Sequence, residues 1–140
     1  MSRLTRQDYP LGQKRPDILF TPTNKAYDDL TLEAALKGDI SSKDLRISPD
    51  TLIMQAEISE NIGRDQLGRN FRRAAELITI SDERILEIYS ALRPNRSSHE
   101  ELLAIADELK RDYQAFENAK LVEEAAEVYS RRNLLRIDEE

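Results

Sequence analysis

The chain has 140 residues, and its 21 basic and 27 acidic side chains give a formal net charge of -6. One histidine and no cysteine exclude a disulfide framework, thiolate metal sites, cysteine nucleophiles and multi-histidine zinc sites. The acidic balance argues against binding to nucleic acid or an anionic membrane, and the lack of a long apolar run or signal peptide predicts a soluble, cytoplasmic protein.

The first thirty residues carry three of the five prolines, Pro10, Pro16 and Pro22. Because proline lacks a backbone donor and restricts the residue before it, this spacing predicts an extended arm over residues 1–30. The arm also holds large apolar side chains, which a disordered tail would lack, so we expect it to pack on its own domain or on a partner. Residues 31–140 are rich in good helix formers and are predicted to form an all-α domain, a small bundle of amphipathic helices.

The helical domain is predicted to begin with two short elements. Thr31 is expected to cap a short helix that stops at Gly38, and Ser42 is expected to cap a further turn. The serine before Pro49 then marks a stronger helix start, because proline suits the first position of a helix. This longer helix is expected to end near Gly63.

Two amphipathic helices are predicted in the middle of the chain. The first covers residues 64–78, where apolar side chains recur at helical spacing on one face. Ser81 is expected to cap the second, and Pro94 prevents its continuation.

Ser98 and Glu101 form a capping box that opens the next predicted helix. Its apolar stripe is expected to run as far as Phe116, after which the stripe changes phase. Either the helix breaks near residues 117–119, or one long rod shows opposite faces to two neighbours; we favour the break. The charged tail over residues 131–140 is expected to fray.

No constellation of residues in the sequence supports catalysis. His99 begins a stretch that resembles a zinc-protease motif but lacks its second histidine. Adjacent acidic pairs point about 100° apart on a helix and do not enclose an ion. The arginines are interleaved with carboxylates rather than aromatic residues, which argues against nucleic-acid binding. They are therefore expected to be solvated and locally paired, or in some cases to dock into a partner.

Six strings of the sequence follow one another in an order typical of one protein family. They are Asp8–Leu11 (DYPL), Thr31–Glu33 (TLE), Asn70–Leu77 (NFRRAAEL), Asp82–Tyr89 (DERILEIY), Ala91–Pro94 (ALRP) and Glu101–Leu109 (ELLAIADEL). Together they resemble the small (gamma) subunit of adenosylcobalamin-dependent glycerol and diol dehydratases. The resemblance covers the chain from about residue 8 to its end.

The resemblance implies a heterohexamer with two copies each of a large (alpha), a medium (beta) and a small subunit. The large subunit of that family is a β/α barrel that holds the substrate and a metal ion, and adenosylcobalamin lies between the large and medium subunits. An adenosyl radical abstracts hydrogen from the diol, and the loss of water gives an aldehyde. The small subunit is helical, docks mainly on the large one and contributes to assembly. It is expected to supply no catalytic, cofactor-binding or metal-binding residue.

With this resemblance, the arm becomes a candidate for contact with the large subunit, because a segment broken by prolines has no helix of its own to bury apolar side chains. Some of the arginines are expected to be interface anchors, because arginine is enriched at such positions. The candidate interface residues are Tyr9, Leu11, Ile18, Phe20, Arg72, Arg73, Arg93 and Arg96. Residues 1–47 carry 8 basic and 7 acidic side chains, against 13 and 20 in residues 48–140, so the near-neutral part of the chain is the better candidate for a buried contact.

Two other functions are compatible with the sequence. A helical adaptor without an enzyme partner would share the amphipathic pattern, and a nucleic-acid-binding domain is disfavoured by charge. Because the family pattern begins by residue 8, we expect no N-terminal extension of the kind that directs some diol dehydratases into a bacterial microcompartment. This start favours the glycerol branch of the family or a trimmed diol enzyme.

Overall fold

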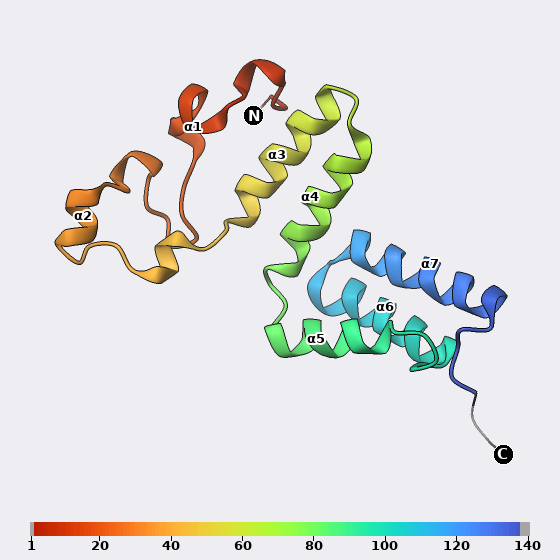
Figure 1. Ribbon diagram of the computed structural model, residues 1–140. Coiled ribbons are helices and arrows are strands. Elements are labelled where there is room, and N and C mark those ends of the chain that lie inside the picture. The colour runs from red at the N-terminus through yellow and green to blue at the C-terminus, as the bar shows by residue number, and fades with distance from the viewer. Residues whose placement is uncertain (1, 138–140) are drawn as a thin grey trace. The chain divides into compact units, whose positions relative to one another are not determined.

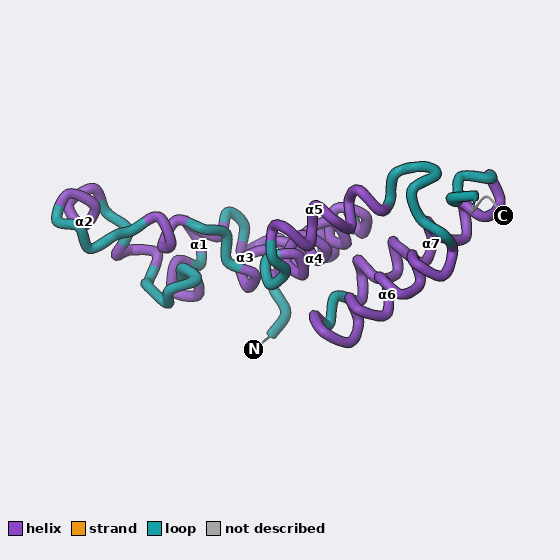
Figure 2. The backbone as a smooth tube through the Cα atoms, turned by 90° about the horizontal axis from the view of Figure 1, so that it is seen from below, coloured by secondary structure: helices purple, strands orange, loops and turns teal. Residues whose placement is uncertain are grey.

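Good helix formers dominate the sequence, and the computed structural model is correspondingly all-α over the residues it describes, 2–137 (Figures 1 and 2). The only β-type pairing among these residues is a single bridge between Phe20 and Ala26. The chain divides into two compact units, Met1–Ile78 and Thr79–Glu140. The arm over residues 1–30 therefore belongs to the first unit.

The arm consists of short helical turns rather than of continuously extended backbone. These turns are η1 (Arg6–Asp8), α1 (Leu11–Lys14), η2 (Pro16–Ile18) and η3 (Tyr27–Asp29). Two of the three prolines stand at the starts of such turns: Pro10 precedes α1 and Pro16 is the first residue of η2. Proline limits the length of a helix but suits its first turn, so the arm folds into several single turns instead of one long element.

The arm packs on a helical hairpin of its own unit. The hairpin is formed by α3 (Pro49–Asn61) and α4 (Asp65–Leu77), which lie side by side in antiparallel directions (Figure 1). The buried side chains of Leu4, Leu11 and Leu19 form one apolar cluster with Ile58 of α3. The arm was expected to pack on its own domain or on a partner. For Leu4, Leu11 and Leu19, the structure shows packing on its own domain.

The turn between α3 and α4 and the close approach of the two helices depend on two glycines. Gly63 has a φ of +79°, a left-handed conformation that glycine adopts without steric cost. Gly68 is buried on α4, and a Cβ atom at this position would lie 2.7 Å from Cγ of Glu60 and 3.3 Å from the carbonyl oxygen of Ala56. Glycine at this position therefore leaves room for the Glu60 side chain where the two helices approach each other.

Between the arm and the hairpin lie α2 (Leu32–Leu36) and η4 (Ser42–Leu45). As predicted, Thr31 caps α2, since its hydroxyl accepts a hydrogen bond of 3.1 Å from the Ala34 N–H. The capping residue of η4 is Ser41, one position before the predicted Ser42, because Asp44 completes a capping box with Ser41.

In the second unit, α5 (Asp82–Ala91) precedes a hairpin of α6 (His99–Tyr113) and α7 (Phe116–Arg132). Ser81 and Ser98 cap α5 and α6 as predicted, and Ser98 forms its capping box with Glu101. The core of this unit is made by buried side chains of the hairpin, namely Leu102, Ala106, Leu109, Ala119, Val122 and Ala126.

The predicted break before α7 is confirmed, and it lies slightly earlier than residues 117–119. Gln114 adopts a left-handed conformation with a φ of 53°, and Ala115 precedes the first residue of α7. Phe116 therefore opens α7 and is 61% exposed, so its predicted place at the end of the α6 stripe is wrong.

The expected fraying of the tail is wrong for residues 133–137, whereas residues 138–140 lie outside the described part of the chain. The Asn95 N–H donates to the Leu134 carbonyl oxygen at 2.7 Å, and the Arg136 N–H donates to that of Ser97 at 2.9 Å. The Arg136 guanidinium also forms a bidentate pair with the Glu101 carboxylate, at 2.9 and 3.0 Å. The tail is thus fixed to the loop before α6.

No helix within residues 2–137 has the length and apolar character needed to cross a bilayer.

Candidate partner-binding surface of the first unit

Large apolar side chains are exposed throughout the first unit. Single exposed apolar residues are ordinary, whereas a contiguous set indicates a binding surface. The apolar residues of this unit that are at least 38% exposed are Tyr9, Phe20, Tyr27, Leu32, Leu36, Leu45, Ile47, Ile62, Leu67 and Ile78.

Two hollows on the surface bring several of these side chains together. The first, of about 440 Å³, lies between residues 19–30, residues 44–48 and the start of α3, and its exposed apolar walls are Phe20, Tyr27, Leu45 and Ile47. The second, of about 530 Å³, lies between the arm and the α3–α4 turn, and its exposed apolar walls are Tyr9, Ile62 and Leu67. Gln55 of α3 lines both hollows.

The two hollows follow one face of α3. Leu52, Gln55 and Ser59 of α3 line the hollows together with its capping residues Ser48 and Ile62. These five residues are spaced four and three positions apart, which places them on one side of a helix. Fourteen residues of helix measure about 21 Å. We call this surface, formed by the linings of both hollows, the α3 groove.

Positive charge dominates the lining of the α3 groove. Arg6 and Arg64 line the second hollow and Arg46 lines the first, and none of the three forms an ion pair with another described residue. Among the described lining residues, the one carboxylate is Asp44. The groove thus differs in sign from the chain as a whole, whose net charge is -6.

Asp44 is occupied by internal contacts. It is buried, with an exposed fraction of 3%, and its carboxylate accepts hydrogen bonds from Lys25 Nζ at 2.8 Å, from the Thr23 hydroxyl and from the Ser41 N–H at 2.7 Å. Lys25, followed by Thr23 and Ser41, holds the pKa of the Asp44 carboxyl well below its ordinary value. Asp44 therefore connects residues 23–25 with η4 and does not neutralise the groove arginines.

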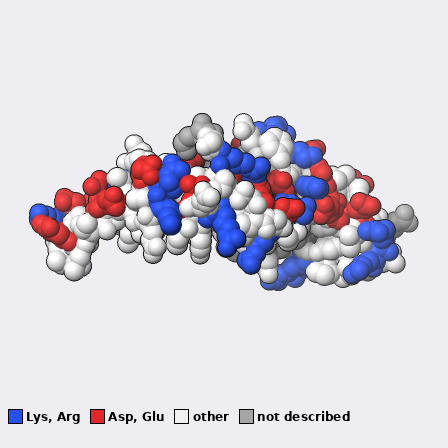
Figure 3. Space-filling model, turned by 90° about the horizontal axis from the view of Figure 1, so that it is seen from above, with Lys and Arg blue, Asp and Glu red and all other residues white. Residues whose placement is uncertain are grey.

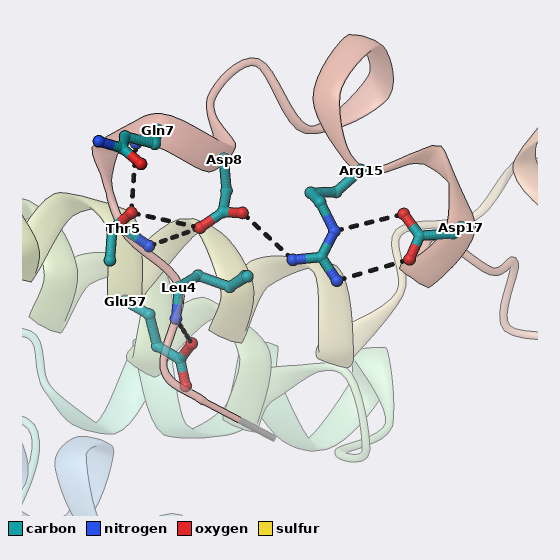
Figure 4. A network of polar contacts seen from close by, with 7 residues as sticks. All are labelled: Leu4, Thr5, Gln7, Asp8, Arg15, Asp17 and Glu57. Carbon is teal, nitrogen blue, oxygen red and sulfur yellow. Dashed lines mark hydrogen bonds and ion pairs between the residues drawn. The ribbon is translucent and has the colours of Figure 1, made fainter.

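A polar network within the arm and between the arm and α3 holds the arm in place (Figure 4). The Leu4 N–H donates to the Glu57 carboxylate of α3 at 3.1 Å, and the Thr5 N–H donates to Asp8 at 2.8 Å. The Arg15 guanidinium lies between Asp8 and Asp17, at 3.1 and 3.3 Å. The Thr5 N–H and then Arg15 lower the pKa of the Asp8 carboxyl, because both stabilise its charged form.

The structure separates the four arm residues that the sequence named as interface candidates. Leu11 is buried with an exposed fraction of 8%, and Ile18 packs against the same cluster, so a helix of their own unit covers them. This overturns the reason for naming these two. Tyr9 and Phe20 are 66% and 46% exposed and line the two hollows. The contact of any of the four with another subunit stays a prediction.

The candidate arginines do not form one cluster. Arg72 makes a bidentate pair with Glu60, at 2.7 and 3.1 Å, which joins α4 to α3, and Arg73 donates to Asn70 on its own helix. Arg93 and Arg96 are exposed residues of the second unit. On the face drawn in Figure 3, basic side chains are interspersed with acidic and uncharged ones.

Sequence reasoning missed the wall residues Tyr27, Leu45 and Ile47. They lie in or beside single turns, where no helical period distinguishes an exposed apolar side chain from a buried one. One signal in the sequence could have indicated them. Leu45 and Ile47 flank Arg46 in a stretch too short to form a helix with a buried face, which favours their exposure.

Comparison with known proteins gives a consistent result. A family described as "Dehydratase small subunit" matches residues 4–136. The propanediol dehydratase small subunit of Citrobacter freundii is 52% identical over 132 residues, which cover 94% of this chain and 77% of the relative. The protein of the same name from Salmonella typhimurium is 53% identical over 132 residues, which cover 94% of this chain and 76% of the relative.

Proposed function

The chain belongs to the dehydratase small subunit family, and from this membership we propose that it is the small subunit of an adenosylcobalamin-dependent enzyme that dehydrates a 1,2-diol to an aldehyde. The observation that carries the proposal is the family match over residues 4–136. The high identity to two propanediol dehydratase small subunits supports it. The chain is thus part of a dehydratase, a lyase, and the proposal gives it no catalytic residue of its own.

The partners proposed for this chain are the large and medium subunits of the same enzyme, in a heterohexamer with two copies of each. The main contact is proposed with the large subunit, and the role of the chain is to stabilise the assembly. The exposed apolar walls of the α3 groove support this role, because a free-standing domain seldom leaves such a surface uncovered. The α3 groove also favours a subunit over a self-contained adaptor.

Adenosylcobalamin and the metal ion are proposed to bind outside this chain. His99 is the first residue of α6, is half-buried and lines neither hollow. Residues 2–137 contain no group of three or more His, Cys, Asp or Glu side chains placed to hold a metal ion. We assign no step of the reaction to this chain.

Propane-1,2-diol is the substrate to test first, because both relatives are named for it. Glycerol is the second. The choice between them belongs to the large subunit. We place the assembled enzyme in the cytoplasm.

The test is reconstitution. The chain alone should release no aldehyde from propane-1,2-diol, and a mixture with the large and medium subunits and adenosylcobalamin should do so, measured with an aldehyde-trapping reagent. The control is the same mixture without this chain, which should lose most of the activity. A chain that neither copurifies with the other two subunits nor restores activity would contradict the proposal and favour a free-standing adaptor.

A further inference from the structure

We infer that the α3 groove binds one segment of another dehydratase subunit, an apolar segment with acidic residues near both of its ends. The inference rests on the proposed function, because it takes the occupant from the same enzyme. Beyond the proposed function, the inference says where on this chain the other subunit binds and what kind of segment binds there.

The first argument is shape. The groove follows one face of α3 and its capping residues for about 21 Å, a length that a partner helix of about fourteen residues would match. Its base is already well packed, since Leu19 and Ile58 are buried at 8% and 7% exposure. Its walls are open, because Leu45 and Ile47 are 71% and 65% exposed. A rigid base with exposed apolar walls is suited to docking, since binding orders few further groups.

The second argument is charge. Arg46 stands at one end of the groove and Arg6 and Arg64 stand at the other. Three arginines elsewhere in the first unit, Arg3, Arg15 and Arg72, are paired with carboxylates. The groove arginines have no such partner among the described residues, and the nearby Asp44 is held by Lys25. Carboxylates near both ends of a docked segment would complement them.

The apolar walls are tested by measuring the affinity of this chain for the complex of the other two subunits. Ile47→Ser should raise the Kd at least about tenfold, because Ile47 is one of the most exposed apolar wall residues of the groove. Leu86→Ser on α5 is the matched control: Leu86 is also 65% exposed, lies outside the groove and should leave the Kd unchanged. Both side chains are exposed, so circular dichroism should show folded variants. Wild-type affinity of Ile47→Ser, or equal losses in both variants, overturns the inference.

The charges are tested by the association rate. The double variant Arg46→Glu with Arg64→Glu should associate about tenfold more slowly at low salt, and salt should no longer slow its binding. Arg69→Glu is the control, because Arg69 is exposed on α4 and does not line the groove. An unchanged rate with unchanged salt dependence would reject acidic ends on the docked segment.

The occupant is identified by a photo-crosslinking amino acid at position 67 in the reconstituted enzyme, since Leu67 is a wall residue of the second hollow. The expected product joins this chain to an apolar peptide of another dehydratase subunit flanked by Asp or Glu. Crosslinking to a second copy of this chain, or to a peptide without carboxylates, overturns the inference. If the wild-type chain does not bind the other subunits at all, the proposed function fails as well. If it binds and the groove variants bind equally well, the inference fails and the proposed function stands.

Discussion

Single residues in the first unit link segments that are separate in the sequence, and the clearest example is Asp44. Its carboxylate accepts hydrogen bonds from Lys25, Thr23 and Ser41, so one side chain connects residues 23–25 with η4. The sequence shows Asp44 only as one acid among 27. Its role could not be predicted, because the residues that meet it lie up to 21 positions away in loops without periodicity.

Asp44→Asn should lower the melting temperature of the chain, because the neutral amide cannot replace a carboxylate that accepts from Lys25. The lowered pKa of Asp44 makes the stability of the folded chain depend on pH. The contribution of the Asp44 carboxylate to folding is complete above the ordinary pKa of 3.8 and is lost as the pH falls below it towards the folded-state pKa. Melting curves of both proteins between pH 7 and pH 2 should therefore converge at low pH. Asp28→Asn, an exposed control in η3, should melt like the wild type throughout.

Gly68 gives a second prediction at this scale. Gly68→Ala in isolation should lower the free energy of unfolding by about 1–3 kcal/mol, because the new Cβ meets the Glu60 side chain that Arg72 holds. In a Glu60→Ala background the same change should instead stabilise by up to about 1 kcal/mol, since alanine is the better helix former. Urea unfolding of the four proteins checks the cycle, and the absence of coupling would show that Glu60 does not set the helix spacing.

At the scale of elements, the arm has two kinds of apolar residue, and they should respond differently to truncation. Leu11→Ala should cost about 2–4 kcal/mol of folding stability, since Leu11 is in the buried cluster. Tyr9→Ser should leave stability within about 0.5 kcal/mol. If Tyr9 is an interface anchor, Tyr9→Ser should weaken assembly by about 2 kcal/mol. Chemical unfolding and a binding titration separate the two effects, which a deletion of residues 1–20 would mix.

The tail gives a further prediction. Arg136→Ala should lower the stability of the second unit by about 0.5–1 kcal/mol, because its pair with Glu101 is partly exposed. A chain that ends at Asn133 should lose about 2 kcal/mol, since the backbone bonds to Asn95 and Ser97 are also lost. Arg131→Ala is the control, with an exposed side chain in the same part of the sequence. Equal urea midpoints for all variants would show that the tail contributes nothing.

The starts of the elements were predictable where a capping residue marks them. Thr31, Ser81 and Ser98 begin helices as expected, because each hydroxyl satisfies a free N–H of the first turn. The end of α6 was less predictable, since Gln114 takes the left-handed position that glycine or asparagine usually marks. The arm was the hardest element, because one-turn helices have no period.

At the scale of the whole molecule, the helical class and the family were predictable from composition and from six ordered strings, and the groove was not. Apolar residues predict burial, but they do not say whether the same chain or another one covers them. Leu11 and Tyr9 lie two positions apart in one proline-rich segment, and only the first is buried. A large apolar residue beside a proline is compatible both with burial inside the chain and with exposure to a partner, so the sequence does not distinguish the two.

The exposed groove also has a consequence for how the cell balances production of this chain. A copy made without its partners presents open apolar walls, which are the features that chaperones and proteases recognise. Surplus copies would then be removed until their number equals that of the other subunits. On the proposed assembly, the surface that binds the other subunits would in this way also set the stoichiometry of the enzyme.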